Sequence, residues 1–509
     1  MDYPSLLTLF VLVVVLVKFL HKLLSTWQQR PPFLPGPSPR FIVGNEFPTK
    51  LPWLTYTEWG LQYGDVVHAS ALGQHIVIVN SVKAANELFE KRAHIYSDRP
   101  IVTMIELMGW DFNVGLMPLG DRWRQDRRMF QQHFRRDIAL NYRPVQLKKV
   151  HQLLQGLLSD PQDFRELLKT RATSSIMSTV YGYDVKPSND RFVALSENAV
   201  KKLSDSFFPG AVAVNTLPIL RYLPSWMPGA GFQRFAAECR KLTEEMQRVP
   251  FNFTKQNMSD GVDSKSVVAK LLEFSQARGR TNDHNIQEVA ATAYAAGADT
   301  TVSALASFFL AMAVHPDIQK KAQSEIDAII GPHRLPQFED RPSLPFVEAL
   351  YREVMRWKPV LPLGVAHAAT ADDIYRGCLI PKGATVISNI WAMTRDESIY
   401  PDPERFNPDR FFTADGKLNK DDTVLAFGFG RRICVGRHNA DAIVWATMVS
   451  VLSTFNIAKA KDACGKEIDI EPNYSDGLVS HPQSFACSIS PRSETAKNLI
   501  QTITEVQEF

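Results

Sequence analysis

The sequence has few cysteines, and none of them is spaced like part of a zinc site or a disulfide framework. Its 509 residues contain five, namely Cys239, Cys378, Cys434, Cys464 and Cys487. No CxxC pair, the usual signal of a zinc site, is present. An odd, sparse and scattered set is typical of reduced thiols in a reducing compartment.

The sequence also lacks an excess of charge of one sign. Its 57 Lys and Arg residues against 54 Asp and Glu residues give a net charge of +3, so nothing in the composition points to a nucleic-acid partner, and none is expected. No low-complexity linker, internal repeat or charged block divides the interior. The length alone would allow about three domains, but these absences favour one large domain.

One long apolar run stands near the N-terminus. Residues 4–24 read PSLLTLFVLVVVLVKFLHKLL, and about 20 apolar residues are enough to span a bilayer. The alternative is a cleavable signal peptide, which would carry its positive charge before the run, whereas here Asp2 precedes the run and Lys18 and Lys22 stand at its end. Residues 1–28 are therefore predicted to be a single-pass membrane anchor, with everything downstream on the cytoplasmic side.

A proline-rich stretch follows this run. Residues 30–40 read RPPFLPGPSPR. Proline fixes φ, removes a backbone donor and biases the preceding residue towards extended geometry. Residues 29–40 are therefore predicted to be a stiff hinge between the anchor and the rest of the chain.

The rest of the chain, residues 41–509, shows mainly helical patterns. DVVHASALG and HIVIVNS lie on either side of a glycine and predict a β-hairpin, and strands are also expected within 377–389 and 469–490. Helices are predicted over most of 121–323 and again from 436 to 455. The predicted fold class is α+β, mainly helical, with a small β-rich subdomain.

A single cysteine stands in a loop rich in glycine and arginine, directly before an apolar helix. Residues 426–438 read AFGFGRRICVGRH. The residues alone leave three interpretations of Cys434 open: an inert buried thiol, part of a nucleotide-binding loop, or a thiolate bound to a haem iron. The nucleotide loop is the weakest, because Ile433 stands where the third glycine of that fingerprint belongs.

The haem interpretation gives each neighbouring residue type a role. Gly428 and Gly430 would permit a tight turn that aims N–H groups at the sulfur, which together with nearby positive charge would favour the thiolate. Gly436 would let the following helix approach a flat macrocycle. Arg432 would reach a propionate, and Phe427 would shield the sulfur from water.

FGFGRRICVG, residues 427–436, resembles the haem-binding signature of the cytochrome P-450 superfamily, Phe-x-x-Gly-x-x-x-Cys-x-Gly. The resemblance covers nearly the whole chain, because other motifs of the family follow in the right order. It implies that residues 41–509 are a haem-thiolate catalytic domain with the P-450 fold, and that heme b is bound through Cys434. The sequence is most similar to fungal microsomal members of secondary metabolism, of the O-methylsterigmatocystin oxidoreductase and tryptamine 4-monooxygenase types.

A long helix is predicted from residue 286 to residue 316, with the sequence AGADTT in its middle. By itself, this pattern also fits a kinked core helix with a structural acid and alcohol. It resembles the family's Ala/Gly-Gly-x-Asp/Glu-Thr-Thr/Ser motif. The resemblance implies that Thr300 orders water that delivers protons to dioxygen and that Asp299 supports it.

Glu353 and Arg356 lie three residues apart in ALYREVMRWKP, a spacing that by itself describes an ordinary solvated ion pair. They resemble the family's Glu-x-x-Arg motif, completed by the arginine of Pro-Glu-Arg-Phe, here Arg405. The resemblance implies a buried network in which each charge needs its partner.

Trp123 and Arg127, in DRWRQDRRMF, resemble the family's Trp-x-x-x-Arg element. Together with Arg432 and His367, they are expected to donate to the two haem propionates.

The substrate cavity is expected, by resemblance, to use the middle of the long helix and three largely apolar segments, 101–114, 360–365 and 476–480. An apolar cavity suits a small lipophilic molecule. Residues 208–229, which are amphipathic and punctuated by proline, are expected to form a lid that touches membrane lipid.

These expectations describe a monooxygenase of the endoplasmic reticulum membrane that inserts one oxygen atom of O2 into a small lipophilic substrate. The sequence shows no flavin or nicotinamide module, so NADPH is expected to act through a separate NADPH–cytochrome reductase, with cytochrome b5 as a second electron donor. A basic docking face is expected from Arg122, Arg124, Arg128, Arg431 and Arg437.

Two alternatives remain open from the sequence. A haem-thiolate isomerase, dehydratase or peroxide user would need no reductase, but such enzymes often lose the acid–alcohol pair that is intact here. A membrane-tethered electron carrier would need two axial protein ligands and a closed distal side, whereas Ala296 and Gly297 indicate space.

Overall fold

The structure is a computed structural model that describes Lys18 and residues 31–41, 43–207, 211–262, 265–279 and 283–503. Apart from Lys18, the predicted anchor lies outside the described residues. Within them, one helix is long and apolar enough to cross a membrane, α13 (Asp283–Val314), and most of its apolar part is buried inside the protein. It is therefore a core helix.

Helices dominate the described part of the chain. The longer ones are α2 (Pro52–Tyr63), α5 (Asp121–Phe134), α7 (Arg143–Ser159), α8 (Phe164–Tyr181), α9 (Arg191–Phe207), α11 (Gly231–Ser259), α12 (Val267–Ala277), α13, α14 (Pro316–Ile329), α15 (Pro345–Trp357), α17 (Arg437–Thr454) and α18 (Glu494–Gln501). The short ones are α3 (Val82–Ala85), α4 (Thr103–Leu107), α6 (Arg136–Ala139), α10 (Ala213–Thr216) and α16 (Ile390–Met393). The predicted helices over 121–323 and 436–455 are confirmed.

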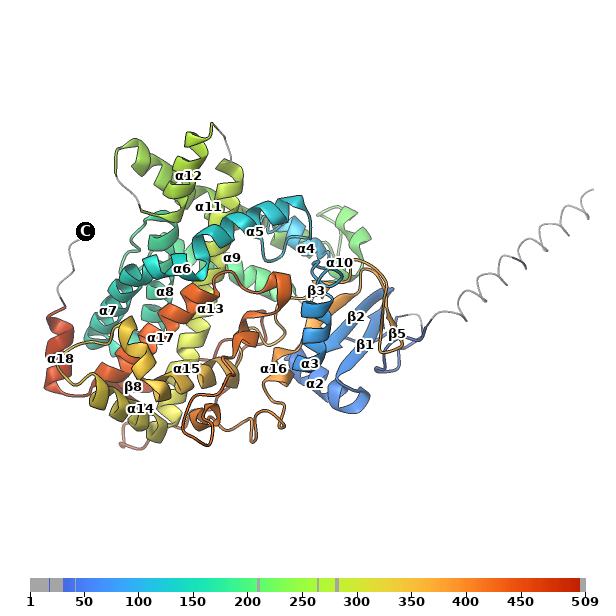
Figure 1. The fold of residues 1–509 in the computed structure, drawn as a ribbon. Helices are drawn as coiled ribbons and strands as arrows, with labels where there is room; N and C mark the ends of the chain where they lie inside the picture. Colours follow the sequence, from blue (N-terminus) through green and yellow to red (C-terminus); the bar gives the residue numbers. More distant parts are fainter. Residues whose placement is uncertain are drawn as a thin grey trace, which may run out of the picture.

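The strands are few and short, as expected for a small β-rich subdomain. They are β1 (Val66–Ala71), β2 (Gln74–Val79), β3 (His367–Ala368), β4 (Asp373–Tyr375), β5 (Cys378–Ile380), β6 (Thr385–Ser388), β7 (Phe455–Lys459) and β8 (Cys487–Pro491). One sheet has the order β1-β2-β6-β3, and β4-β5 and β7-β8 form separate pairs. Figure 1 shows β1, β2 and β5 on the opposite side of the molecule from α7 and α18.

The predicted hairpin is formed by β1 and β2, which pair antiparallel with Ala71 opposite Gln74. The two residues between the strands, Leu72 and Gly73, have φ values of +49° and +82°, which is the positive-φ geometry that tight hairpin turns require. The described part of the proline-rich stretch lies against this hairpin, because His68 N–H donates to the Pro35 carbonyl over 2.9 Å.

Helix α13 runs through the middle of the helical part (Figure 1) and carries most of the core. Its C-terminal half packs with α7, α15 and α17, and its N-terminal half packs with α5, α8, α9 and α12. A helix that is apolar on all sides is stable only inside a protein. Gly297 allows α8 to come close, because a Cβ there would lie 2.9 Å from Ile176 Cγ1.

Candidate functional site

A large cavity lies between α13 and the loop that carries Cys434, and both of them line it. All the segments predicted for the substrate cavity contribute. Its lining includes Trp110, Asn113, Val114, Ala293, Ala296, Asp299, Thr300, Val360, Leu361, Val365, Leu478 and Val479. The lining is mostly aliphatic, so the cavity suits a lipophilic molecule with few polar groups.

Cys434 is a free cysteine whose exposed surface faces this cavity. Its backbone N–H donates to the Phe427 carbonyl over 2.9 Å, which fixes the loop. Burial by the surrounding protein raises the pKa of the thiol, while the backbone N–H groups of Gly436 and Arg437 and the charge of Arg127 lower it. Burial outweighs the other effects, so the pKa of the thiol lies above its ordinary value, and the N–H groups and Arg127 would stabilise the thiolate once a cation is bonded to it.

The two other predicted neighbours of the sulfur, Gly436 and Phe427, also line the cavity. A Cβ on Gly436 would meet nothing closer than the Cys434 sulfur, at 3.9 Å, so the start of α17 leaves open space above it.

Gly430 has a different role from the predicted one. Its N–H donates to Glu90 Oε1 over 2.6 Å and not to the sulfur, and the residue is not part of the cavity lining. Its φ is +55°, and a Cβ would lie 2.2 Å from the Phe89 carbonyl oxygen. Gly430 therefore lets the loop approach the π-helical turn η1 (Asn86–Lys91), and the N–H groups at the sulfur come from the residues after Cys434.

Three guanidinium groups gather at one side of the cavity: Arg127 and Arg432, which were predicted, and Arg99, which was not. Burial lowers the pKa of Arg127 and of Arg432 to about 10 each. Burial, followed by the repulsion of the other two arginines, lowers the pKa of Arg99 well below its ordinary value. Within the part of the chain that the structure describes, Asp98 is the one carboxylate that opposes this effect on Arg99 and Arg432.

The backbone holds these arginines in place without neutralising them. Arg99 donates to the carbonyls of Gly115, Val365 and Ala366, and Arg127 donates to the Ile433 carbonyl. Arg432 lies with its Cζ 4.1 Å above the Trp123 ring. Arg432 Nη2 and Trp123 Nε1 are buried and have no hydrogen-bond partner in the described part of the protein.

These donors indicate a missing anion. Three positive charges with one neighbouring carboxylate leave two charges uncompensated, and a buried donor without an acceptor is costly. A flat group with two carboxylates and a metal that binds a thiolate fits these residues. Haem b has both features, and its two propionates match the two uncompensated charges.

His367 lies on β3 and lines the same cavity. Its Nδ1 is 2.7 Å from the Tyr96 carbonyl oxygen, so that contact orients the ring. Burial and the nearby charge of Arg99 lower the pKa of His367 well below its ordinary value, so the ring is neutral. Because Nδ1 donates its hydrogen to the carbonyl, Nε2 can only accept a hydrogen bond, and His367 does not fit the predicted role of a propionate donor.

The structural network contains Glu353 and Arg356, but its third member is Arg410 and not Arg405. Glu353 and Arg356 are fully buried and form two hydrogen bonds of 2.7 and 2.9 Å. Arg410 Nε lies 3.3 Å from Glu353 Oε1. Arg405 is exposed, and in the described part of the chain it forms no ion pair with Glu353. It stands five residues before Arg410, and its side chain faces solvent.

The acid and the alcohol of α13, Asp299 and Thr300, both line the cavity. The Thr300 hydroxyl donates to the Ala296 carbonyl over 2.8 Å, so its lone pairs remain free to accept from water. Asp299 Oδ1 lies 3.1 Å from Nε2 of His481, a contact that the sequence did not predict.

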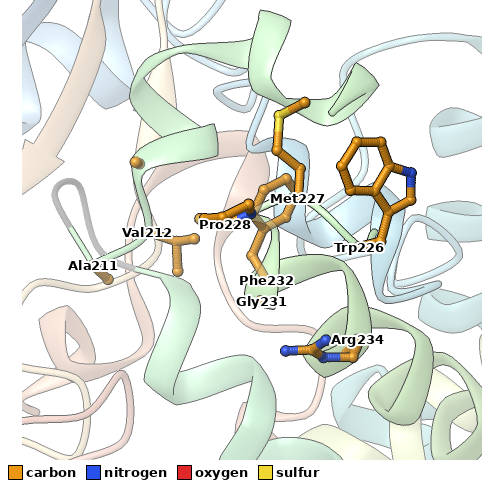
Figure 2. Close-up of a pocket in the computed structure, with 10 residues that line it drawn as sticks. Ala211, Val212, Trp226, Met227, Pro228, Gly231, Phe232 and Arg234 are labelled. Carbon is orange, nitrogen blue, oxygen red and sulfur yellow. The ribbon is translucent and has the colours of Figure 1, made fainter. Parts of the chain in front are cut away.

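A second, open cavity of about 600 Å³ lies in the predicted lid. Figure 2 shows that Trp226, Met227, Pro228 and Phe232 surround it with Arg234 close by. Three large side chains of the neighbouring stretch project into solvent: Ile219 is 71% exposed, Tyr222 76% and Trp226 78%. Exposed large apolar groups gathered in this way mark a contact surface.

Three functional residues escaped the sequence analysis for different reasons. Arg410 stands in the 3-10 helix η6 (Pro408–Phe411), which has the same Pro-x-Arg-Phe pattern as the stretch with Arg405. The sequence therefore contains two candidates for the arginine that completes the network. Arg99 and His481 carry no local pattern, because their partners lie far away in the sequence.

Comparison with known proteins agrees with this geometry. The family model for cytochrome P450 matches residues 34–488. Cytochrome P450 monooxygenase 208 of Postia placenta is 43% identical over 485 residues, which cover 94% of each chain. Cytochrome P450 monooxygenase ple1 of Rhodocybe pseudopiperita is 42% identical over 477 residues, 92% of this chain and 91% of the relative. Cytochrome P450 monooxygenase COX2 of Coprinopsis cinerea is 40% identical over 481 residues, again 92% and 91%.

Proposed function

The chain belongs to the cytochrome P450 family, and from this premise we propose that it oxidises a small lipophilic molecule of the kind made in fungal secondary metabolism. Its class is that of a haem-thiolate monooxygenase. One atom of O2 enters a C–H bond or a double bond of the substrate, and the other leaves as water. The two electrons come from NADPH through a reductase.

The carrying observation is that one aliphatic cavity contains a lone cysteine, two uncompensated positive charges and an acid–alcohol pair. Haem, when bound, supplies the activation of O2, and a thiolate ligand favours O–O cleavage. The protein's own residues supply the rest. Arg99, Arg127 and Arg432 would hold the two propionates, with a further donor from Trp123 Nε1.

Burial raises the pKa of the Cys434 thiol, and the residues near the sulfur would stabilise it as an anion once a metal is bonded to it. The N–H groups of Gly436 and Arg437 point at it, and Arg127 adds a positive charge. On α13, the Thr300 hydroxyl accepts a hydrogen bond from water in the cavity, because its own proton is held by the Ala296 carbonyl. Asp299 next to it can accept a proton and release it again.

The proposed electron donor is a separate NADPH–cytochrome reductase, with cytochrome b5 as a second one. Of the five predicted docking arginines, Arg124 is paired with Asp121 over 2.6 Å and Arg122 is paired with Glu288. Arg128 and Arg431 are exposed and form no ion pair within the described residues. The proposed docking face therefore rests on Arg128 and Arg431, together with Arg437.

The proposed location is the endoplasmic reticulum membrane, with one spanning segment at residues 1–28 and the catalytic domain in the cytoplasm. The exposed side chains Ile219, Tyr222 and Trp226 support a second contact with lipid, because aromatic side chains favour the membrane interface. The cavity of Figure 2 opens beside them, which would let an apolar substrate pass from lipid towards α9 and α11.

The test is expression of the whole chain in microsomes together with a fungal NADPH–cytochrome reductase. Reduced protein is expected to give a thiolate-type Soret band with carbon monoxide. The band should vanish in Cys434→Ala and persist in Cys464→Ala, a matched change at an exposed free cysteine.

Substrates are then sought by spectral binding of terpenoid, polyketide and indole compounds, followed by turnover under ¹⁸O2. Incorporation of one labelled atom that depends on NADPH and reductase supports the proposal. Turnover with peroxide alone, or an isomerised product without label, would favour the alternative that needs no reductase.

A further inference from the structure

We propose that His481 is the residue through which protons pass from solvent to Asp299. This inference rests on the monooxygenase function, in which the oxygen atom that leaves as water needs two protons. Asp299 lines the central cavity, but His481 does not. Since Nε2 of His481 lies 3.1 Å from Asp299 Oδ1, the imidazole stands behind the carboxylate, on the side away from the cavity.

Both groups are accessible enough to exchange protons. The side chain of His481 is 26% exposed and that of Asp299 is 29% exposed. Histidine is the side chain that ordinarily gains and loses a proton near neutral pH. A proton would enter at one ring nitrogen and leave from Nε2 to the Asp299 carboxylate. The ring ends neutral, and only bonds to hydrogen change.

The segment that carries His481 is pinned to α13 on the face of the helix that presents Asp299. Asp299, Ser303 and Ser307 are spaced by four residues and therefore share one face. Ser303 donates to the Ser480 carbonyl over 2.5 Å, and the Tyr474 hydroxyl donates to Ser307 over 2.9 Å. Both serines are buried, so separating the segment from α13 would break both hydrogen bonds and leave the Ser303 hydroxyl without its acceptor.

Hydrogen bonds within the segment and to a neighbouring helix also fix its backbone. The N–H of His481 donates to the Ser475 hydroxyl over 2.9 Å, and the N–H of Ser475 donates to the His481 carbonyl over 2.8 Å. On the far side, Arg165 donates to the carbonyls of Pro482 and Gln483. A backbone fixed on both sides holds the imidazole at hydrogen-bond distance from one carboxylate, as proton transfer requires.

A merely structural ion pair predicts different behaviour from a proton route. His481→Gln keeps a hydrogen-bond donor towards Asp299, but an amide cannot carry a proton at neutral pH. The matched control is His284→Gln. His284 Nε2 lies 3.2 Å from Glu288 Oε1 on the same helix, and that carboxylate does not line the central cavity.

The first measurement is NADPH consumption by the whole protein with reductase and O2, without added substrate, in H2O and D2O. We expect His481→Gln and Asp299→Asn each to slow it about tenfold or more and to raise the solvent isotope effect. The double variant should be no slower than the slower single variant, because both act in one route. His284→Gln should match the wild type.

The second measurement does not depend on turnover. The infrared stretch of carbon monoxide bound to the reduced protein responds to charge and hydrogen bonding in the cavity. It should shift in the same direction in His481→Gln and Asp299→Asn, and stay unchanged in His284→Gln.

Wild-type NADPH consumption in His481→Gln, or losses that multiply in the double variant, would overturn the inference. An unchanged carbon monoxide stretch in His481→Gln would overturn it too. A wild-type protein without the thiolate-type Soret band would instead refute the monooxygenase function, so the two failures can be told apart.

Discussion

Replacing Arg410 by glutamine is expected to destabilise the protein, whereas replacing Arg405 by glutamine is expected to leave its melting temperature unchanged. Arg410 Nε lies 3.3 Å from the fully buried Glu353 carboxylate. Its two Nη atoms donate to the carbonyls of Pro401, Asp402 and Arg405 over 2.8 to 3.1 Å. One charge-assisted contact and three hydrogen bonds sum to about 3 kcal/mol after desolvation is included.

Replacing Glu353 by glutamine should cost more. It removes the negative charge of a carboxylate that accepts two hydrogen bonds from Arg356, one from the Asn407 N–H over 2.7 Å, and one from Arg410, and it puts an amide NH2 group in place of one acceptor oxygen. Two guanidinium groups would then stay buried without a counter-ion, which costs about 3–5 kcal/mol. For a domain of about 450 residues, each kcal/mol corresponds to about 1 °C in melting temperature.

The assay is loss of haem absorbance and of tryptophan fluorescence on heating, at one fixed scan rate because a large haem protein unfolds irreversibly. The expected order of destabilisation is Glu353→Gln, then Arg410→Gln, with Arg405→Gln equal to the wild type. A loss in Arg405→Gln as large as that in Arg410→Gln would refute the assignment of the third member of the network.

Three further predictions concern other parts of the structure. Gly430→Ala should lower the melting temperature more than Gly428→Ala. Both glycines have positive φ, but only at Gly430 would the added Cβ meet a backbone carbonyl oxygen, that of Phe89, at 2.2 Å. Equal losses in the two variants would contradict this. Burial and a neighbouring histidine lower the pKa of His68 to about 4. The unfolded chain therefore binds a proton that the folded chain does not, and the free energy of unfolding should fall as pH drops from about 6.5 towards 4. The fall should be less steep in His68→Gln. Melting temperatures that change in parallel with pH in the two proteins would contradict this. Arg431→Glu should weaken reductase binding at low salt about fivefold, measured as the KM for reductase. Arg248→Glu, which changes an exposed charge on α11, should leave that KM unchanged. Equal effects of the two variants would place the docking face elsewhere.

The site could be predicted from the sequence wherever its residues are close neighbours along the chain. Cys434 and Gly436 stand in one loop, and Asp299 and Thr300 in one helix, so their residue types and spacing were enough to identify them as candidate site residues. The β1–β2 hairpin was predictable for the same reason, because a turn with positive φ is a local property of two residues.

Contacts between distant segments needed the tertiary structure. Whether Arg405 or Arg410 reaches Glu353 depends on the path of the chain between them, since both stand in a Pro-x-Arg-Phe pattern. Gly430 lets its loop pack closely against the backbone of Phe89, more than three hundred positions earlier in the chain, and its N–H does not point at the sulfur.

By itself, the sequence determined the family, the thiolate, the acid–alcohol pair and the helical class, because each depends on residue types at short spacing or on the periodicity of apolar side chains. Only the tertiary structure decided that Arg99 lies beside Arg127 and Arg432, that Arg410 reaches the buried Glu353 and that His481 lies 3.1 Å from Asp299. Ion pairs and hydrogen bonds act over a few ångströms in space, and the packing of whole helices and loops sets which distant side chains come that close.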